Sequence, residues 1–162
     1  MSIAENIKSI HTNIKAAHER ARVDNGEVTL VAVSKYHTID EIKEAYQDGQ
    51  RVFGENRVQE LLPKIEAMSA HDDVKWHLIG HLQKNKVRQV VGKVAMIESV
   101  DSIELLKEIE KRAANQGCTV DILLQVNVAE EEQKSGIAFE DIDAFVAEMP
   151  AMPHVFLKGL MF

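Results

Sequence analysis

Short apolar runs alternate with amphipathic helical stretches along the chain. An opening helix is predicted first, because Ile3, Ile7, Ile10 and Ile14 share one face at helical spacing. Six runs rich in Val, Ile and Leu then have the character of strands, at residues 29–35, 51–55, 75–80, 94–99, 120–128 and 154–162. The segments between these runs carry apolar residues at helical spacing, so a helix is expected between each pair of consecutive strands.

Polar residues just before the helical segments indicate where several helices begin. Thr38 is followed three residues later by Glu41, which is the spacing of a capping box. Asn56 and Asp101 stand in the same place before two later helices, and each is predicted to be the N-cap. Pro63 lies inside the helix after Asn56 and should kink that helix or delay its start.

The alternation of strands and helices predicts a parallel sheet, because parallel neighbours need crossover connections. The strands are apolar on both faces, which suits a sheet that is covered on both sides. Two α/β architectures fit this pattern equally: a doubly wound open sheet and a (β/α) barrel. In both, the ligand site lies at the carboxyl ends of the strands.

Composition narrows the class of protein. A chain of 162 residues is long enough for one domain, expected to span 1–162, with 45% hydrophobic and 28% charged residues. The net charge of −7 argues against a nucleic-acid-binding protein. No apolar run approaches the roughly 20 residues that cross a bilayer, so no membrane association is expected. The single Cys118 fits a reducing, cytoplasmic environment.

Candidate chemistry gathers at the predicted strand ends. Lys35 closes the first apolar strand, and a lysine amine that is sheltered there could attack an aldehyde to form a Schiff base. A lysine whose charged end simply reaches water explains the same position. Asn56 is accounted for by helix capping alone, and Glu55 beside it could act as a general base.

Two histidines follow the third strand at H-x₃-H spacing. His77 and His81 could bind zinc at this spacing on a helix, but here they straddle a strand end and no nearby residue completes a ligand set. His77 is therefore predicted to be a hydrogen-bonded histidine at the rim or in the core. The residues alone indicate a small-molecule site and leave its chemistry open.

Several segments resemble one known family in order and spacing. They are "AVSK", "VFGENRVQE", "WHLIGHLQKNK", "IESVDS", "LLQVNVAEEEQKSGI" and "GLM". Together they are similar to the pyridoxal phosphate homeostasis proteins. The resemblance covers essentially the whole chain, and "FGEN" with "WHLIGHLQ" after "VSK" is its most specific part.

The resemblance implies a single-domain α/β barrel like the N-terminal domain of alanine racemases, with an extra N-terminal helix. It also implies pyridoxal 5′-phosphate (PLP) held as a Schiff base by the lysine of "VSK", which is Lys35 here. Asn56 and His77 match family positions near the cofactor, and Met161 ends a strand that borders the site. The resemblance further implies a protein that carries the cofactor in vitamin B6 homeostasis without robust catalysis. A racemase-like enzyme and a fragment that no longer holds PLP stably are the alternatives.

The family's chains continue beyond "GLM" through two more strands. The expected architecture is therefore an incomplete TIM-type barrel with about six of eight parallel strands. Loops after the seventh and eighth strands commonly grip phosphate in such barrels, so weak or absent stable PLP binding is expected of this polypeptide. The family resemblance implies a monomer, whereas two open sheet edges would favour self-association.

Overall fold

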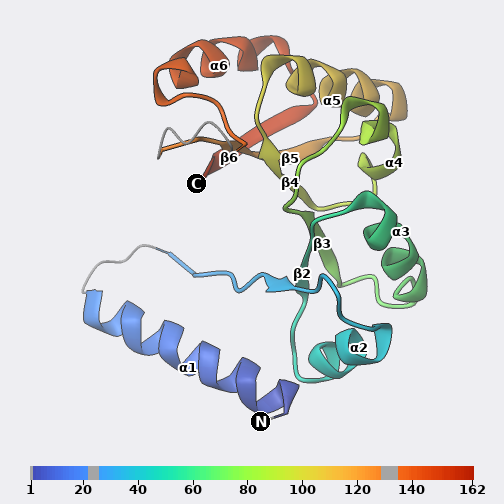
Figure 1. Cartoon of the computed structure of the whole chain (residues 1–162), viewed down its shortest axis with the longest axis vertical. Coiled ribbons are helices and arrows are strands. Elements are labelled where there is room, and N and C mark those ends of the chain that lie inside the picture. The colour runs from blue at the N-terminus through green and yellow to red at the C-terminus, as the bar shows by residue number, and fades with distance from the viewer. Residues whose placement is uncertain (1, 22–25, 129–134) are drawn as a thin grey trace.

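Six parallel strands form one sheet in which the spatial order follows the chain, from β1 to β6 (Figure 1). The computed structural model describes residues 2–21, 26–128 and 135–162. The strands are β1 (Ala32–Val33), β2 (Val52–Glu55), β3 (Lys75–Leu78), β4 (Met96–Val100), β5 (Val120–Gln125) and β6 (Val155–Met161). A sequential order without reversal is that of a (β/α) barrel, because a doubly wound sheet reverses at its switch point. The predicted barrel type is therefore confirmed over the described strands.

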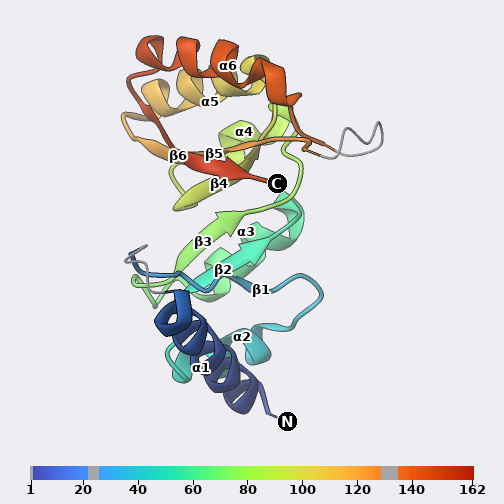
Figure 2. The same cartoon turned by 90° about the vertical axis from the view of Figure 1, so that its left-hand side faces the viewer.

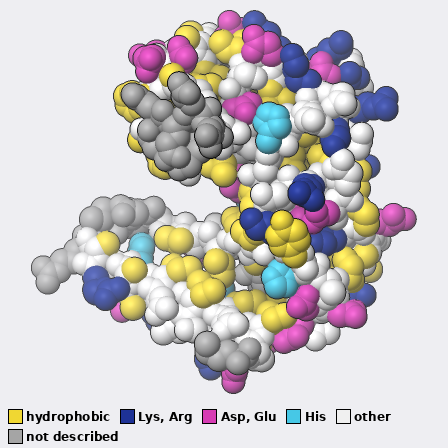
Figure 3. Space-filling model, in the orientation of Figure 1, with side chains coloured by type: hydrophobic (Ala, Val, Ile, Leu, Met, Phe, Trp, Pro, Cys, Tyr) yellow, Lys and Arg dark blue, Asp and Glu magenta, His cyan; other side chains and the backbone are white. Residues whose placement is uncertain are grey.

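Helices cover only one face of this sheet. They are α1 (Ile3–Ala21), α2 (Ile39–Gln47), α3 (Val58–Ala67), α4 (Val87–Val90), α5 (Ile103–Gln116) and α6 (Ile142–Glu148), with short 3₁₀ turns η1 (Lys84–Lys86), η2 (Phe139–Asp141) and η3 (Met149–Ala151). Figure 1 shows α2 to α6 along the outer side of the curved sheet, and Figure 2 looks onto the strands from the other side. The molecule is hollowed on that side (Figure 3). We call the strand surface turned away from the helices the open face.

The core lies between the strands and the outer helices. Strand β5 shows the reason, since its residues alternate strictly between buried and partly exposed positions. Ile122 and Leu124 of this strand are fully buried, as are Leu106 and Ile109 of α5. The helices cover one face of the described strands, and the second face of each strand turns toward the barrel interior.

Two helix starts differ from the predictions. The N-cap of α3 is Arg57 rather than Asn56, because the amides of Glu60 and Leu61 both donate to the Arg57 carbonyl, at 3.0 and 2.9 Å. The N-cap of α5 is Ser102 rather than Asp101, since the Ser102 hydroxyl accepts from Leu105 N–H.

The capping box before α2 and the proline in α3 were also predicted from local sequence. The capping box of Thr38 and Glu41 is confirmed, with both of its hydrogen bonds present. Pro63 lies inside α3, which begins five residues earlier at Val58, so the proline does not delay the helix. Strand β1 is much shorter than its apolar run, and the helix expected between the third and fourth strands divides into η1 and α4. No helix in the described ranges combines the length and apolarity needed to cross a membrane.

Candidate functional site at the carboxyl ends of the strands

Lys35 lies in a tight turn that leaves the carboxyl end of β1. The N–H of His37 donates to the Ser34 carbonyl at 3.0 Å, which closes a four-residue turn with Lys35 and Tyr36 in its centre. Tyr36 has a φ of +67°, a left-handed conformation that a bulky residue adopts only when its surroundings enforce it. The side chain of Lys35 is exposed, so the predicted shelter is not found among the described residues.

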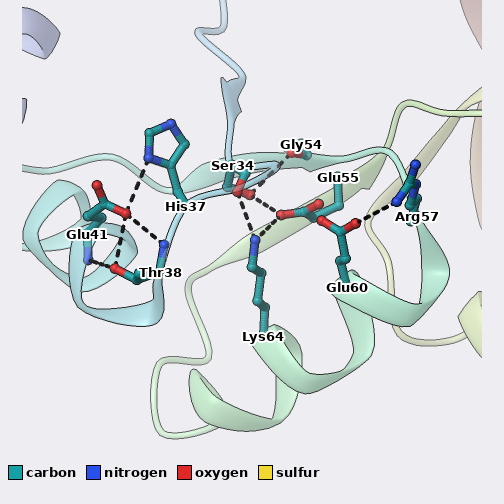
Figure 4. Close-up of polar contacts among 9 residues, drawn as sticks. All are labelled: Ser34, His37, Thr38, Glu41, Gly54, Glu55, Arg57, Glu60 and Lys64. Atoms are coloured by element: carbon teal, nitrogen blue, oxygen red, sulfur yellow. Dashed lines mark hydrogen bonds and ion pairs between the residues drawn. The ribbon is translucent and has the colours of Figure 1, made fainter.

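The turn is held from below by a buried polar cluster of Ser34, Glu55 and Lys64 (Figure 4). The Lys64 ammonium donates to the Ser34 carbonyl at 2.8 Å and to Oε1 of Glu55 at 2.5 Å. The Ser34 hydroxyl donates to the same carboxylate oxygen at 2.8 Å. Glu55 is completely buried and its charge is matched by Lys64, so the sequence-based role of Glu55 as a rim general base is not supported.

Asn56 follows β2 directly and is wedged against the end of β3. A Cβ placed on Gly80 would lie 2.3 Å from the Asn56 carbonyl oxygen, so only glycine permits this approach. The Ser99 hydroxyl holds the other side of Gly80 by donating to its carbonyl at 2.7 Å. The side-chain Oδ1 of Asn56 is buried and has no hydrogen-bond partner among the described residues.

His77 lies on the open face, in register with Gly54 of β2, which is itself in register with Val33 of β1. Its Nδ1 is 2.6 Å from Oε1 of Glu98 on β4. His77 is therefore the hydrogen-bonded histidine that the sequence predicted. His81 is not brought to it, because His81 is exposed and pairs with Asp101 instead, at 3.3 Å.

Met161 ends β6, at the other end of the sheet order from β1. It is in register with Gln125, and its carbonyl accepts from Val126 N–H at 2.9 Å. It shares the carboxyl rim with Lys35, but the other strands of the sheet lie between them in the pairing order. Lys35, Asn56 and His77 thus come from three consecutive strands, whereas Met161 comes from the far edge.

Sequence reasoning missed three residues that support this site. Glu98 was not assigned to His77, and the close approach at Gly80 cannot be seen in a linear sequence. Lys64 did leave a signal, because it falls three residues after Leu61, which itself falls three after Val58 on the buried face of α3. A lysine in such a row must find a buried partner or carry its charge to the surface.

Comparison with known proteins identifies the family. Residues 6–162 match the family described as alanine racemase, N-terminal domain. The pyridoxal phosphate homeostasis protein of Aquifex aeolicus is 39% identical over 161 residues, which is 99% of this chain and 70% of that protein. The chain belongs to the pyridoxal phosphate homeostasis protein family. This confirms the resemblance read from the "VSK", "FGEN" and "WHLIGH" segments.

Solved structures place this family member in the same fold. PipY of Synechococcus elongatus with PLP bound has a TM-score of 0.83 and 36% identity, over 99% of this chain and 69% of that chain. PipY without PLP superposes with a TM-score of 0.86. The histidine racemase of Leuconostoc mesenteroides is only 16% identical, with a TM-score of 0.69 over 96% of this chain and 39% of that chain, and shows the shared fold alone.

Proposed function

We propose that this family member binds PLP covalently through Lys35 and acts as a cofactor carrier in vitamin B6 homeostasis. The observation that carries the proposal is the position of Lys35, exposed in a turn anchored at the carboxyl rim of a barrel sheet. The family supports it, since curated relatives are named for PLP homeostasis and PipY has been solved with PLP bound.

Covalent binding through Lys35 requires the formation of a Schiff base with PLP. PLP supplies an aldehyde, which reacts with the deprotonated form of a lysine amine. A C=N bond forms between Nζ and the aldehyde carbon, and the carbonyl oxygen leaves as water, so no oxidant or reductant is needed. An exposed Lys35 side chain is open to a molecule that approaches from the rim.

The neighbouring residues fit a polar aromatic ligand. Asn56 has a buried Oδ1 with no partner in the described part of the chain, and a ligand donor that reached it would satisfy this acceptor. His77 presents an imidazole on the open face, oriented by Glu98 through Nδ1. Gly54 stands between Val33 and His77 without a side chain of its own. We assign Asn56 and His77 to the ring of the cofactor and Met161 to the far border of the site.

Borohydride trapping tests the proposal. The chain is mixed with PLP, reduced, digested and mapped, with Lys35→Ala as the loss variant and Lys43→Ala as a control at an exposed helix lysine. We expect one modified peptide that contains Lys35, retained in Lys43→Ala and absent in Lys35→Ala. Modification scattered evenly over surface lysines would contradict the proposal. Exchange of the α-hydrogen of alanine in deuterated buffer, lost in Lys35→Ala, would show a racemase-like enzyme instead of a carrier.

A further inference from the structure

We propose that Lys64 is a positioning residue for Lys35. Its ammonium holds the carbonyl that immediately precedes Lys35 and so sets the direction from which the Lys35 amine meets an aldehyde. The inference rests on the proposed function of Lys35, and it assigns a role to a lysine that is buried beneath the turn.

Lys64 and the amide of His37 both hold the carbonyl of Ser34. The Ser34 carbonyl accepts from Lys64 Nζ at 2.8 Å and from His37 N–H at 3.0 Å, so both of its lone pairs are used. The amide of Ser34 donates to the Gly54 carbonyl at 2.9 Å. The carbonyl of the peptide group that leads into Lys35 is therefore held by α3 and by the turn, and the preceding peptide group is held by β2.

The chain is also fixed just after Lys35. Thr38 caps α2, with its N–H donating to Glu41 at 2.7 Å, and only Lys35, Tyr36 and His37 lie between the two anchored ends (Figure 4). Tyr36 adopts a left-handed backbone conformation in this turn, which is unfavourable for a bulky residue. A strained turn held at both ends has little freedom to move Lys35 away from its position.

Packing alone does not explain a charge at position 64. The same face of α3 buries Val58 and Leu61, so an apolar residue would complete the row. Lys64 is only 9% exposed and Glu55 is 0% exposed, and Oε2 of Glu55 has no hydrogen-bond partner among the described residues. Buried ion pairs are often no better for stability than apolar residues of similar volume, so their specific contribution is geometry. Here that geometry is the position of the Ser34 carbonyl.

The test removes the ammonium without stranding a buried carboxylate. In the double variant Glu55→Gln/Lys64→Met, the glutamine still accepts from the Ser34 hydroxyl, and the bond from Nζ to the Ser34 carbonyl is lost. Lys64→Arg keeps a cationic donor and serves as the rescue variant. Lys107→Met removes a lysine from a more exposed pair with Glu148, at 3.3 Å, and serves as the control.

Two measurements on folded protein report the result. The first is amide exchange of His37 without cofactor, which we expect to become about tenfold faster in the double variant, as for the loss of one charge-assisted hydrogen bond. The second is the ratio of PLP label on Lys35 to label on exposed Lys43 after borohydride reduction, which we expect to fall about tenfold. Lys64→Arg should recover part of both losses, and Lys107→Met should change neither.

The outcomes separate this inference from the proposed function. Normal labelling of Lys35 in the unsubstituted chain, with either measurement unchanged in the double variant, would overturn the positioning role alone. A general loosening of the fold would raise exchange at core amides such as Ile122 as well, and that result would also overturn it. Absence of Lys35 label in the unsubstituted chain would overturn the proposed function, and the positioning role with it.

Discussion

His77 of β3 and Glu98 of β4 are joined across the open face, with Nδ1 of the imidazole 2.6 Å from Oε1 of the carboxylate. Both side chains are largely shielded from water, at 11% and 15% exposure. A carboxylate at Nδ1 selects the tautomer and the ring orientation of a histidine, and it leaves Nε2 outside that hydrogen bond. The pair therefore connects His77, a residue of the proposed cofactor site, to the neighbouring strand β4.

The first prediction concerns the energetic coupling of this pair. His77→Gln, Glu98→Gln and the double variant are compared by urea denaturation in a double-mutant cycle. We expect a coupling energy of about 0.5–3 kcal/mol, because residues that share a hydrogen bond are not additive. The exposed Glu66→Ala variant should change the free energy of unfolding by less than about 0.5 kcal/mol. Additive effects of the two substitutions would show that the contact contributes no measurable coupling energy.

The second prediction concerns the close approach of Asn56 to Gly80. In Gly80→Ala the new Cβ would lie 2.3 Å from the Asn56 carbonyl oxygen and 2.7 Å from its Cα, so the backbone of one segment must move. We expect a loss of about 1–3 kcal/mol in the free energy of unfolding, as for overpacking. We also expect weaker PLP labelling of Lys35, because Asn56 is displaced from the rim.

Gly49→Ala is the matched control for that substitution. Gly49 has a φ of +97° and no atom within 4 Å of its missing Cβ. Alanine there is therefore destabilising only through its backbone conformation and not through a steric clash. It should lower stability and leave labelling of Lys35 intact. Equal labelling of Lys35 in Gly80→Ala and Gly49→Ala would show that Asn56 does not contribute to the cofactor site.

The third prediction follows from the capping box before α2. The pKa of Glu41 is lowered from its ordinary value of 4.5, chiefly by the Thr38 backbone N–H and then by the Thr38 hydroxyl and His37. A lowered pKa in the folded state means that the stabilisation is present at neutral pH and is lost as the pH falls through the folded value. Titration of the Glu41 carboxyl carbon by NMR should therefore give a midpoint below 4.5.

Thr38→Ala and Glu41→Gln make that measurement decisive. Thr38→Ala removes the hydroxyl and retains the backbone N–H, so the pKa of Glu41 should return only part of the way to its ordinary value. Glu41→Gln has no charge to titrate at this position. The stability of the first turn of α2 should therefore no longer fall through protonation of residue 41 at low pH. An ordinary midpoint for Glu41 would contradict the hydrogen bonds assigned to the capping box.

Local pattern predicted the order of strands and helices well and their ends less well. The alternation of β5 and the capping box at Thr38 are set by nearest neighbours, so they can be read from residues a few positions apart. Asn56 and Asp101 have side chains suited to N-capping, yet the N-caps of the helices are Arg57 and Ser102. In the first case the chain at Asn56 is drawn against Gly80, which lies 24 positions further along the sequence.

The amino-acid sequence by itself determined the parallel α/β class, the family and the identity of Lys35 as the candidate amine, because apolar periodicity and short motifs are local properties. Apolar periodicity alone left a barrel and a doubly wound sheet open, the family resemblance favoured the barrel, and the strand order of the assembled chain confirmed it. The tertiary structure also decided the partners of the site, Lys64 under Ser34 and Glu98 beside His77. The physical reason is that a buried charge is stable only where a distant segment brings it a counter-charge or a carbonyl, and that meeting is a property of the fold.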